Sequence, residues 1–408
     1  MLIDGFEKVE LLAPAGNFVK LKTVFYYGAD AAYIGGKNFS LRSYADNFAE
    51  DEIERAVEYA HALKKKLYVT VNIFTKNNDF EKLPNYLRFL YTAGVDAIIV
   101  TDPGVIDLAT RIVSNLPLHL STQANVLNKY AADFWLRNGI KRLILAREIK
   151  LQEIQQIHAH NPNVEVEVFV HGAMCMAYSG RCLLSNYLTQ RDANRGECAH
   201  VCRWNYKLTE TNNNITDDIE VEEDKNGTYF LNSKDLNLLS DIGNLINAGV
   251  ISFKIEGRMK SEFYLATVVN AYRRAIDEFI ENGEIQNVDS YETELRKVSH
   301  RGYTKAFLHG NNIETMSDAG SWSETQSDFV AIVRDYADGC AIVEMRGRFY
   351  TGDRVEVISP ISFGSSFIIA SITNMKGELI NDAKRVQELL KIPVPCILSS
   401  GDMLRRIS

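Results

Sequence analysis

No apolar run in the 408-residue sequence approaches the roughly 20 residues that a membrane-spanning helix needs. The first residues, MLIDGFEKVELLAPAG, have neither the basic nor the apolar segment of a secretory signal. Cysteine is scarce, with six residues in the whole chain. We therefore expect a cytoplasmic protein with no membrane partner, whose reduced thiols serve metal binding or catalysis and do not form disulfides.

Several catalytic signatures are also missing. No G-x-G-x-x-G follows the first predicted strand, which argues against a dinucleotide-binding fold, and neither H-E-x-x-H nor G-x-S-x-G occurs. These absences leave a hydrolytic nucleophile poorly supported. A net charge of −8 argues against a protein coated with nucleic-acid-binding charge, although a local basic patch is compatible with it.

Short apolar runs alternate with segments of helical periodicity from the start of the chain. The runs have the length and composition of buried strands, and they fall at 9–15, 31–36, 67–72, 97–102, 118–123, 142–147, 166–172 and 252–258. Such alternation is typical of a parallel sheet covered by helices. Eight strands predict an α/β fold, a (β/α)8 TIM-like barrel, within residues 1–282.

Two regions depart from this alternation. Residues 173–230 follow the seventh strand as one very long loop, which we interpret as an insertion on the catalytic face of the barrel. Residues 283–324 look irregular, and residues 325–408 alternate apolar and polar residues around turns that contain glycine. This last segment is predicted to be a small, all-β, barrel-like C-terminal domain, whose role the sequence leaves open.

Active sites of such barrels lie at the carboxyl ends of the strands, and polar residues gather there in this sequence. The residues that close predicted strands are Asn72, Asp102, Gln123, Arg147, His171, Glu256 and Arg258, and the loop after the second strand adds Arg42 and Asn47. Asp102, which precedes a proline, is also a candidate helix cap. Together these residues indicate a site at one end of the barrel.

Four of the six cysteines lie close together in the insertion: Cys175, Cys182, Cys198 and Cys202. Their spacing, C-x6-C-x15-C-x3-C, fits paired zinc knuckles poorly, whereas iron–sulfur clusters accept more varied spacing. Cys198 and Cys202 would share one face of a helix if their segment were helical. From the residues alone, an iron–sulfur cluster, a zinc site and a lone catalytic cysteine beside a histidine all stay open.

The segment EVFVHGAMCMAYSGRCLLS, at 167–185, resembles the signature of the collagenase-like U32 peptidase family. The segments ELLAPAGN at 10–17, NFSLRSYADNF at 38–48 and FKIEGRMKSEFYLATVVNAYRRAID at 253–277 extend the resemblance over nearly the whole chain. Despite the family name, the better-understood members are hydroxylases that carry a four-iron four-sulfur cluster. The group that this sequence resembles most forms 5-hydroxyuridine at the wobble position of tRNA and is said to use prephenate in place of dioxygen.

The resemblance implies roles for specific residues. The four clustered cysteines would hold a 4Fe-4S cluster, with Cys202 the least secure ligand because relatives differ at this position. Arg147, His171, Glu256 and Arg258 are the catalytic candidates. An anticodon-loop base turned out of its stack would meet a substrate-binding rim. The candidates for this rim are Arg42, Asn72, Gln123, Arg181, Arg195, Arg203 and Trp204.

Arginines are the favoured partners of carboxylates, so we expect a clamp for the dicarboxylate prephenate at the barrel mouth. Arg42, Arg147 and Arg258 are its candidates, and the alternative for each is a salt bridge inside the barrel. Two other functions also stay open: a collagenase-like peptidase and an RNA-binding protein stapled by zinc. The sequence does not tell whether the chain forms a homo-oligomer or needs a protein partner.

Overall fold

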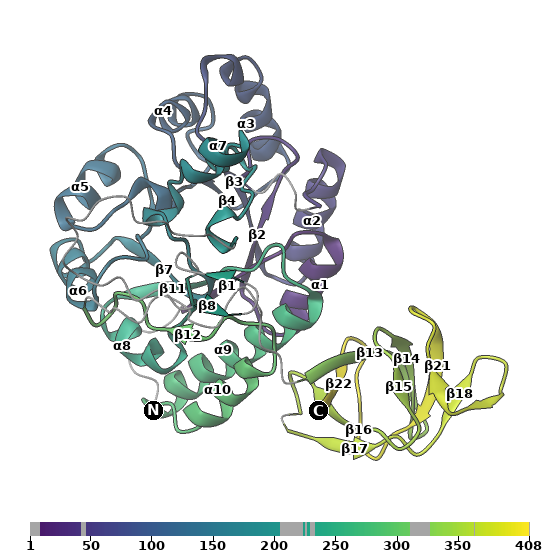
Figure 1. The fold of residues 1–408 in the computed structure, drawn as a ribbon. Helices are drawn as coiled ribbons and strands as arrows, with labels where there is room; N and C mark the ends of the chain where they lie inside the picture. The colour runs from purple at the N-terminus through teal and green to yellow at the C-terminus, as the bar shows by residue number, and fades with distance from the viewer. Residues whose placement is uncertain are drawn as a thin grey trace.

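The computed structural model describes residues 9–41, 46–204, 223–224, 227–228, 233–310, 327–362 and 364–407. Eight parallel strands form the centre of the larger domain, as predicted (Figure 1). They are β1 (Glu10–Pro14), β2 (Ala31–Gly35), β3 (Lys66–Val71), β4 (Ala97–Val100), β5 (Leu118–Leu120), β6 (Arg142–Ile144), β7 (Glu165–Ala173) and β11 (Val250–Ile255). Because β11 pairs in parallel with both β1 and β7, the sheet closes into a (β/α)8 barrel.

Helices surround this barrel as an outer ring (Figure 1). They are α1 (Phe18–Tyr26), α2 (Glu50–Ala62), α3 (Leu83–Thr92), α4 (Pro103–Ile112), α5 (Lys129–Arg137), α6 (Leu151–His160), α8 (Ile242–Asn247) and α9 (Glu262–Asn282). Asp102 caps α4 as expected, because its carboxylate accepts the backbone N–H groups of Gly104 and Val105. Among the described residues, none of the helices combines the length and the apolar composition of a membrane-spanning segment.

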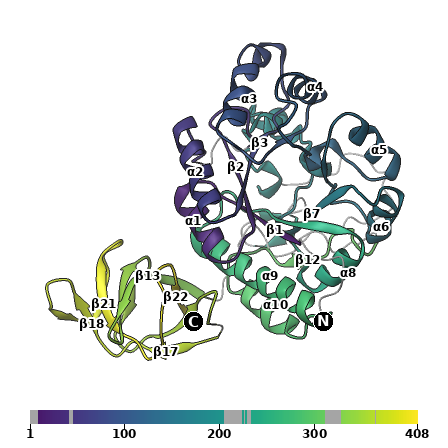
Figure 2. The same cartoon turned by 180° about the vertical axis from the view of Figure 1, so that it is seen from behind.

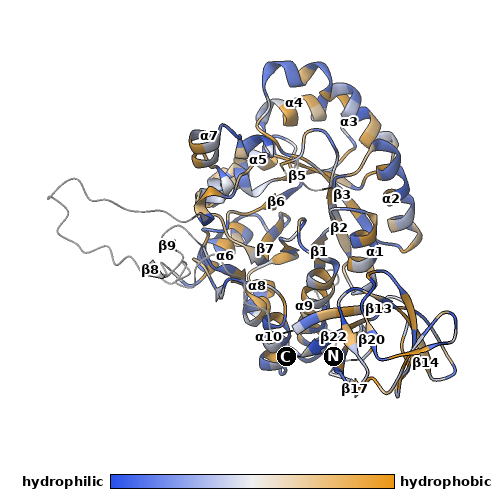
Figure 3. Ribbon diagram, turned by 45° about the vertical axis from the view of Figure 1, so that its right-hand side comes forward, coloured by the Kyte–Doolittle hydropathy of each residue, from blue (hydrophilic) through white to orange (hydrophobic). Residues whose placement is uncertain are grey.

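The strands are buried on both faces, which explains their continuous apolar sequence. The helices are amphipathic instead, and Figure 3 shows hydrophobic and hydrophilic residues on different faces of α3 and α4. Three strands are shorter than predicted: β4, β5 and β6 end two or three residues before 102, 123 and 147. The polar residues that close the predicted strands therefore belong to the loops that begin there.

The segment after β7 departs most from the regular alternation. It contains a short helix, α7 (Leu184–Thr189), and a two-residue antiparallel pair, β8 (Glu223–Asp224) with β9 (Gly227–Thr228). It then returns to the barrel as β10 (Asp235–Asn237), which pairs antiparallel to the end of β7. The barrel sheet thus continues beyond the insertion expected at 173–230.

Residues 283–324 are less irregular than the sequence suggested. Val288–Arg296 form helix α10, which buries Tyr291 and Leu295, and Tyr303–Thr304 form β12, which extends the sheet beside β10. The prediction was wrong here because only two residues of α10 are buried, so the apolar periodicity of the helix is weak.

The C-terminal domain is all-β, as predicted. Its eight-stranded antiparallel sheet has the order β17, β16, β22, β13, β14, β21, β18 and β19, and it surrounds a second hydrophobic core. The strands are β13 (Ser327–Ala337), β14 (Cys340–Met345), β16 (Arg354–Ile358), β17 (Ser366–Ile368), β18 (Ile372–Asn374), β19 (Leu379–Ile380), β21 (Leu389–Pro393) and β22 (Met403–Ile407). A small separate pair joins β15 (Phe349–Tyr350) to β20 (Asp382–Ala383).

The C-terminal domain lies beside α1, α9 and α10, on the flank of the barrel (Figure 2). Buried polar contacts join the two domains. The hydroxyl of Tyr27 donates to the carbonyl of Ile358, 2.9 Å away, and Arg405 reaches Glu294 of α10 at 2.6 Å. Because this flank is not the open end of the barrel, the carboxyl ends of the strands stay uncovered by the second domain.

Candidate functional site

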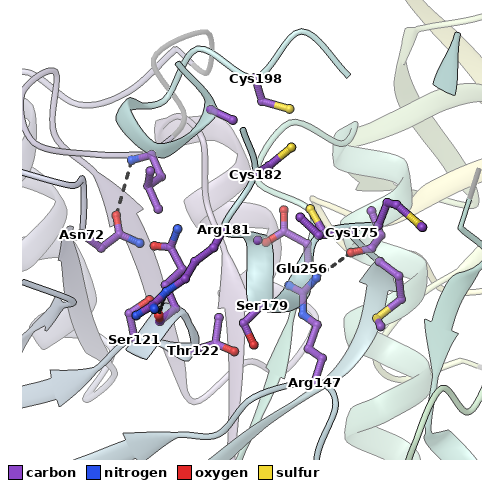
Figure 4. A pocket seen from close by; sticks show the side chains of 18 of the residues that line it. Asn72, Ser121, Thr122, Arg147, Cys175, Ser179, Arg181, Cys182, Cys198 and Glu256 are labelled. Carbon is purple, nitrogen blue, oxygen red and sulfur yellow. Dashed lines mark hydrogen bonds between the residues drawn. The ribbon is translucent and has the colours of Figure 1, made fainter. Parts of the chain in front are cut away.

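A cavity of about 300 Å³ opens at the carboxyl ends of the barrel strands (Figure 4). Its lower part is formed by residues that follow the strands, and its upper part by the cysteine-bearing segment after β7. Of the predicted site residues, the cavity lining includes Asn72, Gln123, Arg147, Arg181, Arg203, Glu256, Arg258 and all four clustered cysteines. The strand-end prediction and the cysteine prediction therefore meet in one place.

Strand β11 and the loop that follows it contribute three charged residues to the cavity lining. Lys254 lies in β11, and Glu256 and Arg258 follow the end of the strand at Ile255; the three are spaced by two residues, as side chains on one face of a strand are. Glu256 and Arg258 were expected from the sequence, but Lys254 was missed. Lys254 lies two residues before Glu256, so extending the same two-residue spacing back along the strand would have predicted it.

The guanidinium groups of Arg258 and Arg147 lie in the barrel mouth. Arg258 is buried, and its Nη1 donates to the hydroxyls of Ser40 and Thr70 at 2.8 and 3.2 Å. Arg147 donates from Nη1 to the carbonyl of Ala173 at 2.8 Å, and its guanidinium lies 4.0 Å from the centre of the Phe169 ring. Within the described residues, its buried Nε has no hydrogen-bond partner. Hydroxyl groups thus contact the guanidinium of Arg258, and a carbonyl and an aromatic ring contact that of Arg147.

The remaining predicted polar residues of the lower cavity are Asn72 and Gln123. The side-chain oxygen of Asn72 accepts the backbone N–H of Leu41, and Gln123 is buried against the cavity. The side-chain oxygen of Gln123 has no hydrogen-bond partner in the described part of the chain. A buried acceptor of this kind is available to a ligand that brings a donor.

The four thiols line the upper part of the cavity and do not form disulfides. Figure 4 shows Cys175, Cys182 and Cys198 on the insertion, with Arg147 and Glu256 in the same close view. Burial raises the pKa of the Cys202 thiol, and the nearby thiols of Cys175, Cys198 and Cys182 raise it further. Cys202 therefore interacts electrostatically with the other three thiols, and all four soft ligands line the same cavity.

Cys198 and Cys202 do not lie on one helix, so the condition for their sharing a helix face is not met. His200, between them, has a left-handed backbone (φ 55°), and a short 3-10 turn begins only at Val201. The two thiols reach the cavity from an irregular loop. The Cys198 sulfur accepts the backbone N–H of His200 at 3.4 Å.

The donor set can be compared with the needs of two kinds of metal centre. A structural zinc ion needs its ligands to converge on one point. Among the described residues, no three Cys, His, Asp or Glu side chains are grouped as ligands of a single ion. A cluster needs only one thiolate at each iron, so four thiols spread around a cavity fit it better.

Arg203 supplies a second observation in favour of an anionic group beside the thiols. Burial lowers the pKa of this guanidinium, whereas Cys202 and Cys175 are among the neighbours that raise it. Within the described residues, its buried Nε has no hydrogen-bond partner. A cluster on four thiolates is anionic, and it would compensate this buried cation.

The arginines predicted to bind substrate differ in what they contact. Arg181 is exposed at the cavity rim, and its Nε donates to the carbonyl of Gln123 at 2.6 Å. Arg195 instead forms two hydrogen bonds to the carboxylate of Asp79, at 2.8 and 3.1 Å, and lies outside the cavity lining. The hydrogen bonds from Arg195 lower the pKa of Asp79. Arg195 thus fastens the insertion to the loop after β3.

Three further predicted residues lie elsewhere. Trp204 is half exposed and is not part of the cavity lining, and Arg42 lies outside the described residues. His171, predicted as catalytic, is buried among the rings of Tyr264, Tyr272 and Tyr303 and does not line the cavity. Burial lowers its pKa to about 3, so its imidazole is neutral near pH 7.

Comparison with known proteins agrees with the sequence resemblance. The model described as Peptidase family U32 matches residues 16–318, and that of the U32 C-terminal domain matches residues 325–405. This chain belongs to peptidase family U32. Within this U32 protein, the first match spans the barrel from α1 onward, the insertion and α10, and the second spans the β domain.

Relatives of this U32 protein have different names. The tRNA hydroxylation protein P1 of Bacillus subtilis is 40% identical over 98% of this chain and 95% of the relative. The 23S rRNA 5-hydroxycytidine synthase of Escherichia coli is 34% identical over 81% of this chain and 50% of its own. A protein named collagenase from Porphyromonas gingivalis is 29% identical over 97% of both.

Proposed function

We propose that this U32 protein is a tRNA-modifying hydroxylase that forms 5-hydroxyuridine at the wobble position. The observation that carries the proposal is the placement of four thiols and five Lys or Arg side chains around one cavity at the barrel mouth. The similarity to a tRNA hydroxylation protein over nearly the full chain supports it, and the name of the E. coli relative supports oxidation at carbon 5 of a pyrimidine.

The cavity suits a nucleobase that leaves its stack. Its volume of about 300 Å³ is at the lower end of small-molecule sites, and its lining combines apolar side chains with a few polar groups. An unpaired anticodon-loop base reaches such a site at low cost, because no base pair is broken. The unpaired oxygen of Gln123 is placed to accept from a base N–H, and Arg181 at the rim is available to a phosphate.

The cofactor in this proposal is a 4Fe-4S cluster held by Cys175, Cys182, Cys198 and Cys202. When bound, it supplies one-electron chemistry to the site. The chain's own residues do the remaining work: Arg203 offsets the negative charge, and Cys198 receives a hydrogen bond from the backbone.

The proposed oxygen donor is prephenate, without a need for dioxygen. Arg147 and Arg258 are the described candidates for its carboxylates, and Lys254 adds a third cation to the same cavity. Glu256, whose carboxylate accepts the Tyr33 hydroxyl at 3.3 Å, is the acidic group there and is a candidate to hold a proton during the reaction.

Peptide hydrolysis is the alternative, and the P. gingivalis relative is the observation in its favour. A cysteine peptidase needs an imidazole as the base for its thiol. His171 does not line the cavity, and the backbone N–H of His200, which donates to the Cys198 sulfur, cannot act as a base. The four thiols and the cationic side chains around one cavity, together with the similarity to tRNA hydroxylation proteins, favour hydroxylation.

The test is complementation. A bacterial strain that lacks wobble-uridine hydroxylation is supplied with the wild-type chain or with Cys182→Ala, and its tRNA nucleosides are measured by mass spectrometry. We expect 5-hydroxyuridine with the wild-type chain and none with the variant. Absence of the nucleoside with a folded, expressed wild-type chain would refute the function. A strain that also cannot make prephenate should lose the modification and regain it when prephenate is supplied.

A further inference from the structure

The loop between α7 and Cys198 contains a buried side chain that no part of the proposed chemistry uses. Asn194 is 7% exposed and lies outside the cavity lining, in a short 3-10 turn (Ala193–Arg195). Its side chain points away from solvent and toward the backbone at Cys182, twelve residues earlier. An amide in this position can fix a neighbouring segment through both of its polar atoms.

Asn194 binds both sides of the peptide backbone at Cys182. Its Oδ1 accepts the N–H of Cys182 at 3.3 Å, and its Nδ2 donates to the carbonyl of Cys182 at 3.0 Å. The pair fixes the orientation of the amide, because the N–H needs an acceptor and the carbonyl needs a donor.

The backbone of Asn194 is itself fastened to the barrel. Its carbonyl accepts the N–H of Phe74, 2.9 Å away, in the loop after β3. The next residue, Arg195, donates to the carbonyl of Phe74 at 2.8 Å and forms the ion pair with Asp79. Through these contacts, Cys182 is linked to the rim of the barrel as well as to its own loop.

We propose that Asn194 is a positioning residue that fixes the Cys182 thiol at the cavity wall before any metal is bound. The proposal rests on the proposed function only for the nature of the metal. It holds for the metal-free chain, because every contact that supports it is made by protein atoms. A site whose ligands are already in place loses less conformational freedom when it binds.

The chemistry of the amide suggests two variants. Asn194→Ala removes both hydrogen bonds. Asn194→Asp keeps an oxygen for the N–H of Cys182 but replaces the donor with a second acceptor, which faces the carbonyl of Cys182. The matched control is Asn186→Ala, because Asn186 is an exposed asparagine on α7 in the same insertion.

The main experiment measures thiol alkylation in the reduced, metal-free, full-length protein. Trypsin cleaves after Arg181 and Arg191, so Cys182 is the single cysteine on its peptide and Cys175 lies on another. Rates are compared with that of Cys340 in the same molecule. We expect Cys182 to react about tenfold faster in Asn194→Ala, which corresponds to about 1.4 kcal/mol, while Cys175 and the Asn186→Ala control stay at wild-type rates.

A second measurement uses the metal-loaded protein. A carboxylate beside a cluster ligand adds negative charge, which lowers the reduction potential. We therefore expect a lower midpoint potential in Asn194→Asp than in the wild-type protein, whereas a loosened fold alone would not give this direction. The thermal unfolding midpoint of each variant is recorded to show that the domain stays folded.

Two outcomes would overturn the proposal: an unchanged rate at Cys182 in Asn194→Ala, or an equal acceleration at Cys175 and Cys182. Either would show that Asn194 does not act on Cys182 in particular. A wild-type protein that binds no iron would refute the proposed cofactor, but the alkylation rates would still decide the role of Asn194. The two failures are therefore distinguishable.

Discussion

Lys254 of β11 and Glu167 of β7 form a buried ion pair in the barrel, with Nζ and Oε1 2.8 Å apart. Glu167 also contacts Arg142 at 3.2 Å, and Arg142 in turn binds Glu10, so the pair continues into the interior of the barrel. Burial lowers the pKa of Lys254, whereas Glu167 opposes this change. Lys254 is thus both a wall of the cavity and a member of the internal charge network.

Replacing Lys254 alone should lower the free energy of unfolding substantially. Lys254→Met leaves the fully buried Glu167 without one of its two cations, and removal of one partner of a buried pair typically costs about 3–5 kcal/mol. The double variant Lys254→Met, Glu167→Gln should lose much less than the sum of the single variants. Urea unfolding followed by circular dichroism measures all three free energies, and strictly additive losses would contradict the pairing.

Arg405 should hold the C-terminal domain against the barrel. It is 2% exposed and binds Glu294 of α10 and Glu356 of β16, each at 2.6 Å. Arg405→Met leaves the two carboxylates with Lys297, which lies 2.7 and 2.9 Å from them, so we expect a loss of about 3 kcal/mol and cleavage by trypsin between the domains. Arg385→Met is the control, because Arg385 is 79% exposed, and it should cost less than about 1 kcal/mol.

His171 should contribute to the pH dependence of stability and not to catalysis. Its pKa is about 3 in the fold because of burial, and about 6.5 in an unfolded chain. Below pH 6.5 the unfolded chain binds the extra proton, so this contribution is fully present above pH 6.5 and is lost progressively as the pH falls toward 3. In His171→Gln, the free energy of unfolding measured with urea should fall less over this pH range than in the wild-type protein. An identical slope in both proteins would show that His171 is not buried as neutral imidazole.

Arg195 and Arg181 should respond differently to replacement. Arg195→Met breaks the pairing with Asp79, so it should destabilise the protein by about 1–3 kcal/mol without changing the salt dependence of tRNA binding. Arg181→Met should reduce the slope of log affinity against log salt by about one, as expected for one lost phosphate contact. Filter binding at several salt concentrations measures both, and a reduced slope in Arg195→Met would contradict its structural role.

The sequence predicted the barrel well because its strands are continuous apolar runs, and it predicted the cavity because strand ends meet at one side. It could not predict the partner of Arg195, because Asp79 lies 116 residues away. His171 was expected in the site because it ends a predicted strand. A side chain at that position can point into the cavity or toward the surrounding helices, and the sequence pattern is the same in both cases. Cys198 and Cys202 look helical by spacing, but the left-handed backbone of His200 interrupts them.

The central claim is that the four thiols form one iron–sulfur site. The direct measurement is the iron, sulfide and zinc content of anaerobically purified wild-type protein, together with its visible spectrum. We predict about four iron and four sulfide per chain with broad visible absorption. Cys175→Ser, Cys182→Ser, Cys198→Ser and Cys202→Ser should each lose most of the iron, while Cys340→Ser should keep it. A colourless wild-type protein that contains only zinc, or full iron in the four variants, would contradict the account.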